Sequence, residues 1–149
     1  MAGTSTPNRL AGLPVEDALE QILDAMDAET GTVHVMGSDG LLHLVHHRGG
    51  IPEALMPVIR RIPVGKGMAG LAAERGEPVQ ICNLQTDSSG DARPGARATG
   101  MRGSICVPMK GAGRLVGVLG VAVSRAREFT DAEADWLSRA GAAIAGSLE

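Results

Sequence analysis

Aromatic side chains are almost missing from this chain of 149 residues, which has one phenylalanine, one tryptophan and no tyrosine. A ligand that needs stacking against aromatic rings therefore finds few partners here. The hydrophobic core has to be built from Val, Leu, Ile, Met and Ala side chains, with 21 glycines to allow close packing.

Cysteines, long apolar runs and excess basic charge are scarce as well. Cys82 and Cys106 form neither a disulfide framework nor a metal-type spacing, and we interpret both as buried packing residues. No apolar run approaches the roughly 18 residues of a membrane span, and no charged-then-apolar leader opens the chain. We therefore expect a cytoplasmic protein without membrane contact. The net charge of −3 argues against nucleic-acid binding.

The residues that are present favour a single domain with a real core. Residues 1–13 are small and polar, so we expect a flexible tail there and one domain over residues 14–149. Apolar residues at helical spacing predict a first helix over residues 14–29. A capping box of Thr130 and Glu133 predicts the start of a last helix.

Two short strands, 32–36 and 41–47, flank a turn signal. With Asp39-Gly40 as the loop, Val33 lies opposite His46 and Val35 opposite Leu44. We prefer this register because it gathers the apolar residues of the hairpin on one face; these are Val33, Val35, Leu42 and Leu44.

The second half predicts a sheet with a long loop. We expect a short helix near 52–59, a strand at 78–82, a loop over 83–100, and strands at 104–109 and 115–123. The last strand is apolar at every position, which indicates a central strand covered on both faces. An antiparallel sheet with helices packed against it, an α+β fold, follows from this order.

A glycine-rich stretch from Ile62 to Ile81 separates the two halves. It predicts a short helix that Gly76 ends in a left-handed conformation and that Pro78 prevents from continuing. Gly65, Gly67 and Gly70 either expose backbone amides to a small or anionic ligand or only permit close packing.

Three motifs in order resemble the GAF domain family over residues 15–148. They are Ile62-Pro63-Val64-Gly65-Lys66-Gly67-Met68-Ala69-Gly70 with Glu77-Pro78-Val79, Ser104-Ile105-Cys106-Val107-Pro108-Met109 with Gly117-Val118-Leu119-Gly120-Val121, and Phe129-Thr130-Asp131-Ala132-Glu133. The resemblance implies a five- or six-stranded antiparallel sheet with the terminal helices on one face. The short helices and the long loop then enclose a small-molecule pocket on the other face.

The resemblance also implies a stand-alone sensory module that dimerises through its terminal helices. Its expected partners are a small-molecule ligand, a second copy of the chain and a separate kinase or regulator. The sequence indicates no particular cofactor.

Several other chemistries fit the residues poorly. Gly65 to Gly70 spell G-x-G-x-x-G, but no apolar parallel strand precedes them, and a phosphate-binding P-loop would need glycine at Arg60. His34, His43 and His47 share one face in the preferred register, and we favour a half-solvated face over a metal site there.

This chain lacks the sequence signatures of the enzymatic and cofactor-binding subfamilies of the GAF family. Free methionine sulfoxide reductases have a cysteine where this chain has Met68, and an acid on the strand that contains Ser104. The cyclic-nucleotide signature is absent, and residues 83–103 hold no cysteine for bilin attachment.

We therefore expect a non-catalytic domain that binds a small molecule or an anion such as nitrate. The expected binding residues are Gly67, Met68 and Ala69 at the helix start, Ile81, Ile105 and Val107 on the floor, and Arg93 and Arg102 in the loop. Two alternatives stay open. One is an interaction module without a ligand, working through Leu19, Ile22, Met26, Trp136, Ala140 and Ile144; the other is a sulfoxide reductase.

Overall fold

A computed structural model describes residues 6–92, 97 and 99–148. In chain order its elements are η2 (Pro7–Leu10), α1 (Val15–Met26), β1 (Thr30–Met36), β2 (Leu41–Arg48), η3 (Glu53–Leu55), α2 (Met56–Ile59), β3 (Arg61–Pro63), α3 (Gly67–Arg75), β4 (Val79–Ile81), β5 (Gly103–Gly111), β6 (Arg114–Val123) and α4 (Asp131–Ala145), where η marks a 3-10 turn. None of the described helices is both long and apolar enough to cross a membrane.

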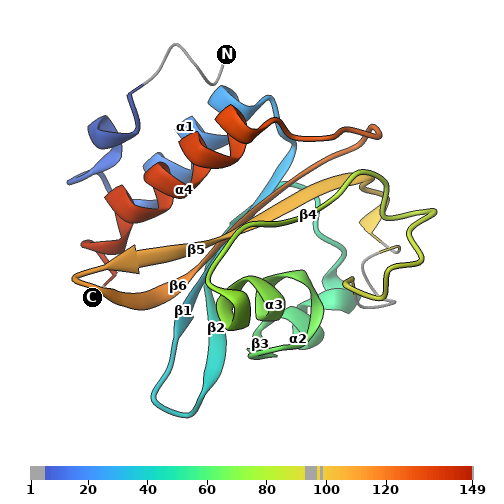
Figure 1. Cartoon of the computed structure of the whole chain (residues 1–149), viewed down its shortest axis with the longest axis horizontal. Coiled ribbons are helices and arrows are strands. Elements are labelled where there is room, and N and C mark those ends of the chain that lie inside the picture. The colour runs from blue at the N-terminus through green and yellow to red at the C-terminus, as the bar shows by residue number, and fades with distance from the viewer. Residues whose placement is uncertain (1–5, 93–96, 98, 149) are drawn as a thin grey trace.

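The strands form one six-stranded antiparallel sheet in the order β3-β2-β1-β6-β5-β4. The terminal helices α1 and α4 lie side by side on one face, and α2 and α3 lie beyond the other face (Figure 1). The predicted α+β architecture, with terminal helices on one face and short helices on the opposite face, is confirmed.

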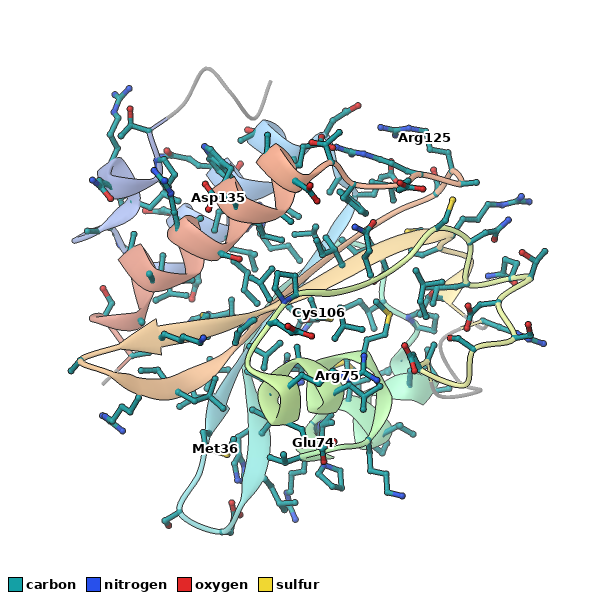
Figure 2. The ribbon with its side chains drawn as sticks, viewed as in Figure 1. Met36, Glu74, Arg75, Cys106, Arg125 and Asp135 are labelled. Atoms are coloured by element: carbon teal, nitrogen blue, oxygen red, sulfur yellow. The ribbon has the colours of Figure 1, made fainter. Side chains whose placement is uncertain are left out.

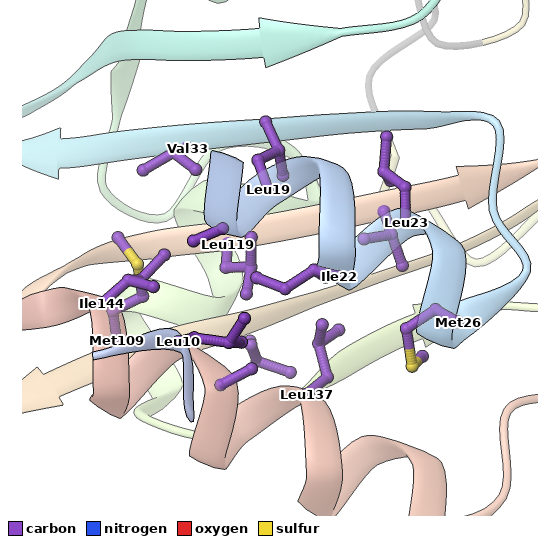
Figure 3. Close-up of a cluster of buried hydrophobic side chains, with 14 of the residues drawn as sticks. Leu10, Leu19, Ile22, Leu23, Met26, Val33, Met109, Leu119, Leu137 and Ile144 are labelled. Atoms are coloured by element: carbon purple, nitrogen blue, oxygen red, sulfur yellow. The ribbon is translucent and has the colours of Figure 1, made fainter. Parts of the chain in front are cut away.

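The larger apolar core fills the space between the sheet and the terminal helices (Figure 3). Leu19 and Ile22 of α1, Leu137 of α4 and Leu119 of β6 are all fully buried there. Each such side chain stabilises the fold by about 1.5–3 kcal/mol when it leaves water. The predicted capping box of Thr130 and Glu133 is present at the start of α4.

The turn between β1 and β2 differs from the prediction. Val33 pairs with His46 as expected, but Val35 pairs with His43 instead of Leu44 because a bulge shifts the register. The Gly37 amide donates to the Leu41 carbonyl at 2.8 Å, so residues 38–40 form the loop. A three-residue loop with a left-handed glycine at its end is a common hairpin connection, and φ of Gly40 is 80°.

The bulge also changes which hairpin residues share a face. Val33 packs in the core under the terminal helices, whereas Leu42 packs in a second apolar cluster on the opposite face. The expectation that the apolar residues of the hairpin share one face is therefore wrong. An extra residue in one strand reverses the alternation of side chains beyond it.

The segment before α1 contributes to the core. Pro7–Leu10 form a 3-10 turn that packs on α4, and Leu10 is only 4% exposed. The sequence analysis placed residues 1–13 in a flexible tail and did not predict this contact. Leu10 and Leu13 are the two leucines of this polar segment, and they are too few to give a periodic signal.

Gly117 sits at the closest approach of two central strands. It pairs with Val35 of β1 and with Met109 of β5. A Cβ atom at this position would overlap the carbonyl oxygen of His34 in β1. The group that approaches Gly117 is therefore the backbone of the neighbouring strand.

We expect Gly117→Ala to lower the free energy of unfolding by about 3 kcal/mol or more, because overpacking against backbone forces strands apart. Urea unfolding followed by circular dichroism measures this change. Gly146→Ala is the matched control, since φ is −62° there and no atom lies within 4 Å of the added Cβ; it should shift stability by at most about 1 kcal/mol. A Gly117→Ala protein as stable as wild type would contradict the pairing of β1 with β6.

Candidate functional site

A cavity of about 200 Å³ lies on the face of the sheet away from α1 and α4. Strands β1, β5 and β6 form its floor, and α2, the start of α3 and the described residues Leu84, Ala92, Thr99 and Met101 surround it. The described residues that line it include Thr30, Thr32, Ile51, Leu55, Val58, Ile59, Ile62, Lys66, Gly67, Met68, Ala69, Leu84, Ala92, Thr99, Met101, Ser104, Cys106, Gly120, Val121 and Ala122.

The start of α3 forms one wall. Gly67, Met68 and Ala69, all expected at the ligand, line the cavity, and their contact with a ligand stays a prediction. The first amides of a helix have no acceptor within it, so they are available to other partners. α3 ends where predicted, at Gly76 with a φ of 68°.

The glycines of this stretch have different roles. Gly67 lines the cavity. Gly70 instead allows the chain to fold onto itself, since a Cβ there would lie 2.5 Å from the Pro63 carbonyl oxygen. Its carbonyl accepts a 2.8 Å hydrogen bond from the Gly65 amide. The close-packing interpretation therefore applies at Gly70, while exposure of backbone amides to a ligand at Gly67 stays a prediction.

The floor is made by other strand residues than those expected. Ile105 and Val107 point to the terminal helices and are fully buried in that core, while Ser104 and Cys106 line the cavity. Alternate residues of a strand face opposite sides of the sheet, and β5 is buried on both. Ile81 packs in the apolar cluster around the cavity without lining it.

Among the described residues, the arginines of the loop do not line the cavity. Arg102 is exposed and contributes backbone bonds instead: its amide donates to Val123 and its carbonyl accepts from Leu84. The Arg97 guanidinium donates to the Asp87 carbonyl at 3.0 Å. Arg93 lies outside the described residues. The expected closure of Arg102 over an anion is therefore not formed in this structure.

The two cysteines differ sharply in their surroundings. Cys106 lines the cavity on β5 (Figure 2), and its burial raises the pKa of the thiol to about 12. Cys82 is exposed, which contradicts the expectation that it is a buried packing residue. It directly follows β4, whose residues alternate between buried and exposed, and Cys82 falls on an exposed position of that alternation.

His34 of β1 is buried next to the cavity wall. Its Nε2–H donates to the carbonyl of Ile59, a lining residue, at 2.8 Å. Its Nδ1 is buried without a hydrogen-bond partner among the described atoms. Burial lowers the pKa of this imidazole, and the nearby His43 lowers it further, against the opposing effect of the Ile59 carbonyl. His34 therefore anchors the end of α2 to the sheet as a neutral group.

The other hairpin histidines lie elsewhere. His43 contacts the carboxylate of Asp39 in the turn at 2.9 Å, and this hydrogen bond lowers the pKa of Asp39. His47 is exposed. Within the part of the chain that the structure describes, no group of three or more His, Cys, Asp or Glu side chains could hold a metal ion.

The residues expected to form an interaction surface are buried in the domain itself. Side chains of α1 and α4 such as Leu19, Ile22 and Ile144 are at most 1% exposed, and Trp136 is 7% exposed. The expectation that these faces form the working surface is wrong, because they make the core against the sheet. A homodimer through the terminal helices stays a prediction and would need their exposed polar residues.

The family model for the GAF domain matches residues 13–149. The chain belongs to the GAF domain family. No curated protein matches its sequence.

Three solved structures show the same fold. The GAF domain of an Acinetobacter phosphoenolpyruvate-protein phosphotransferase is 19% identical, with a TM-score of 0.72 over 89% of this chain and 78% of that one. Free methionine-R-sulfoxide reductase from Neisseria meningitidis, in complex with its substrate, is 19% identical, with a TM-score of 0.73 over 99% and 81%. A domain of a putative two-component sensor histidine kinase from Sinorhizobium meliloti 1021 is 18% identical, with a TM-score of 0.70 over 89% and 87%.

The buried His34 makes the stability of this GAF domain depend on pH. The unfolded imidazole has its ordinary pKa of 6.5, and burial lowers the pKa in the folded state. Stability is therefore full above pH 6.5 and is lost as the pH falls below that value, with a slope of up to about 1.4 kcal/mol per pH unit.

We expect His34→Gln to reduce this slope, because an amide can still donate to Ile59 but takes up no proton. Urea unfolding between pH 7 and pH 5 measures it. His47→Gln, which changes an exposed histidine of the same hairpin, should keep the wild-type slope. Equal slopes for wild type and His34→Gln would contradict the prediction that folding lowers the pKa of His34.

Proposed function

We propose that this GAF domain binds a small molecule in its cavity and transmits the occupancy of the site through α4 to a separate partner. The observation that carries the proposal is the position of the cavity, which α2, α3 and the described residues Leu84, Ala92, Thr99 and Met101 border against the central strands. A ligand there contacts segments that are otherwise held by few buried side chains. Among the neighbours in fold is a domain of a putative sensor histidine kinase.

The segment before α3 is the most weakly held wall. None of the residues in η3 or α2 is buried, although Leu55, Val58 and Ile59 are apolar and line the cavity. Segments with few buried apolar contacts open at low free-energy cost. A ligand that adds apolar contacts to this wall therefore stabilises the closed arrangement, which is the difference in affinity that a conformational response requires.

Hydrogen bonds connect the cavity rim to the start of α4. The Gln80 side chain, next to the rim on β4, donates to the Phe129 carbonyl at 3.0 Å and accepts from the Phe129 amide at 2.8 Å. The Arg127 amide donates to the Cys82 carbonyl at 3.0 Å. Leu84, two residues later, lines the cavity. A displacement of the rim is thus passed directly to the residues that precede α4.

Arg127 extends this connection to α1. Its guanidinium donates to the Met26 carbonyl at the end of α1, contacts Glu133 in α4 and lies 4.4 Å from the centre of the Phe129 ring. Arg127 therefore contacts both terminal helices. It also lies beside Phe129, the residue that Gln80 binds through two hydrogen bonds. We propose this contact set as the route by which the state of the cavity reaches the outer face of the helices.

We propose binding without catalysis. A thiol whose pKa is raised to about 12 is protonated at neutral pH and is a poor nucleophile. That thiol, Cys106, is the cysteine that lines the cavity. The resemblance described in the sequence analysis implies that the reductases have a cysteine where this chain has Met68. Sulfoxide reduction, the activity named for the Neisseria relative, is the enzymatic alternative.

Filling the cavity should abolish binding. A ligand present at 100 times its dissociation constant stabilises the wild-type protein by about 2.7 kcal/mol, and Ala69→Phe should remove this stabilisation because its ring occupies the site. Melting temperatures with a metabolite and anion panel, together with native mass spectrometry, measure the effect. Ala142→Phe, an exposed position on α4, is the control and should bind as wild type does. If no compound shifts the melting temperature and no mass is carried by the purified protein, the proposal fails.

Breaking the Gln80 contact should separate binding from transmission. Trp136 is the single tryptophan of the chain and lies in α4, so its fluorescence reports on that helix. We expect ligand binding to change the emission of wild type, and Gln80→Leu to lose most of that change while its affinity stays within about threefold of wild type. Gln21→Leu, exposed on α1, should respond as wild type does. An unchanged response of Gln80→Leu would exclude this route.

A further inference from the structure

We propose that the cavity selects a compact, uncharged ligand with an aromatic ring, held by sulfur-containing side chains in place of aromatic ones. This inference rests on the proposed function and names the ligand class of that site. It departs from the anion expected from the sequence. Three properties of the cavity support it: its charge, its size and the distribution of sulfur along its walls.

The described walls of the cavity hardly compensate a buried charge. Lys66 is the one described lining residue with a charged side chain, and it is exposed to water at the edge. Arg97 is engaged with the Asp87 carbonyl, and Arg102 is exposed away from the lining. An ion moved from water into such surroundings loses its hydration and finds only the exposed Lys66 and the first amides of α3 as partners. The described walls therefore favour a neutral molecule.

The polar side chains on the cavity floor carry hydroxyl groups. Ser104 lies on the floor and is 9% exposed, and its hydroxyl donates to the Val121 carbonyl at 3.3 Å. Thr30 and Thr32 line the same floor from β1. A hydroxyl can accept a hydrogen bond while it donates one, so the floor tolerates a single O–H or N–H on an otherwise apolar ligand.

The volume limits the ligand to a small ring system. An apolar protein cavity of about 150 Å³ is known to stay dry and to bind benzene. The cavity here has a volume of about 200 Å³ and is therefore somewhat larger than that one. Toluene, phenol and indole are in this range, whereas a nucleotide or a tetrapyrrole is far too large for it.

Three sulfur-containing residues line the cavity. Met68 belongs to α3 and Met101 precedes β5. Cys106 lies on β5 at the face that α3 covers (Figure 2). Sulfur makes favourable contacts with the edges of aromatic rings. The two aromatic residues of the chain, Phe129 and Trp136, both pack in the opposite core and cannot stack on a ligand here. Recognition of a ring therefore falls to the sulfur atoms.

The ligand class is tested with matched pairs of probes on the full chain. Titration calorimetry should detect binding of toluene or indole. Benzoate, which has a carboxylate in place of the methyl group of toluene, should bind at least about tenfold more weakly, as should nitrate. Benzoate or nitrate binding as tightly as toluene would overturn the inference while leaving small-molecule binding intact. Failure of every probe, with no difference between wild type and Ala69→Phe, would overturn both.

The role of sulfur is tested with a variant that conserves volume. Met68→Leu with Met101→Leu should weaken toluene binding by about twofold to tenfold per sulfur removed and leave methylcyclohexane binding unchanged. Met109→Leu, the same substitution in the opposite core, should alter neither affinity. Equal losses for toluene and methylcyclohexane, or tighter binding of methylcyclohexane to the wild type, would show that the cavity does not select an aromatic ring.

Discussion

The close approach of β1 and β6 at Gly117 is the constraint on which the rest of the domain depends. The backbone at Gly117 packs against the His34 carbonyl and leaves no room for a side chain. This contact joins β1 and β6, the two strands at the middle of the sheet. One face of these strands supports the core under α1 and α4, and the other provides the cavity floor. The strand pairing thus sets the positions of both the stable layer and the binding layer.

The two layers are unequally filled because the chain has so few large side chains. Phe129 and Trp136 both lie in the core with the terminal helices. The opposite cluster has only aliphatic and sulfur-containing residues, covered by short elements such as α2 that bury no residue completely. Close packing without voids requires side chains whose volumes fill the available space, and on this face they do not. The scarcity of aromatic side chains is therefore the physical reason why this face keeps a cavity.

The sequence predicted the frame well and the floor of the site poorly. Caps, breakers and apolar periodicity are local, so the limits of α3 at Gly76 and the capping box of Thr130 were predictable. The assignment of Ile105 to the floor was wrong because β5 is buried on both faces, and its apolar run contains no alternation to show which side faces the helices. A bulge, such as the one beside Val33, is likewise set by tertiary pairing and has no distinct local signal.

The incompletely filled cavity also determines how the domain responds to compression. Unfolding eliminates internal voids, so a protein that contains one loses volume when it unfolds, and hydrostatic pressure favours the unfolded chain. Here the cavity of about 200 Å³ lies on the face of the sheet that α2 and α3 cover. Pressure therefore acts on the layer of α2 and α3. A bound molecule would fill this cavity, so the mechanical properties of the empty and occupied domain are distinct.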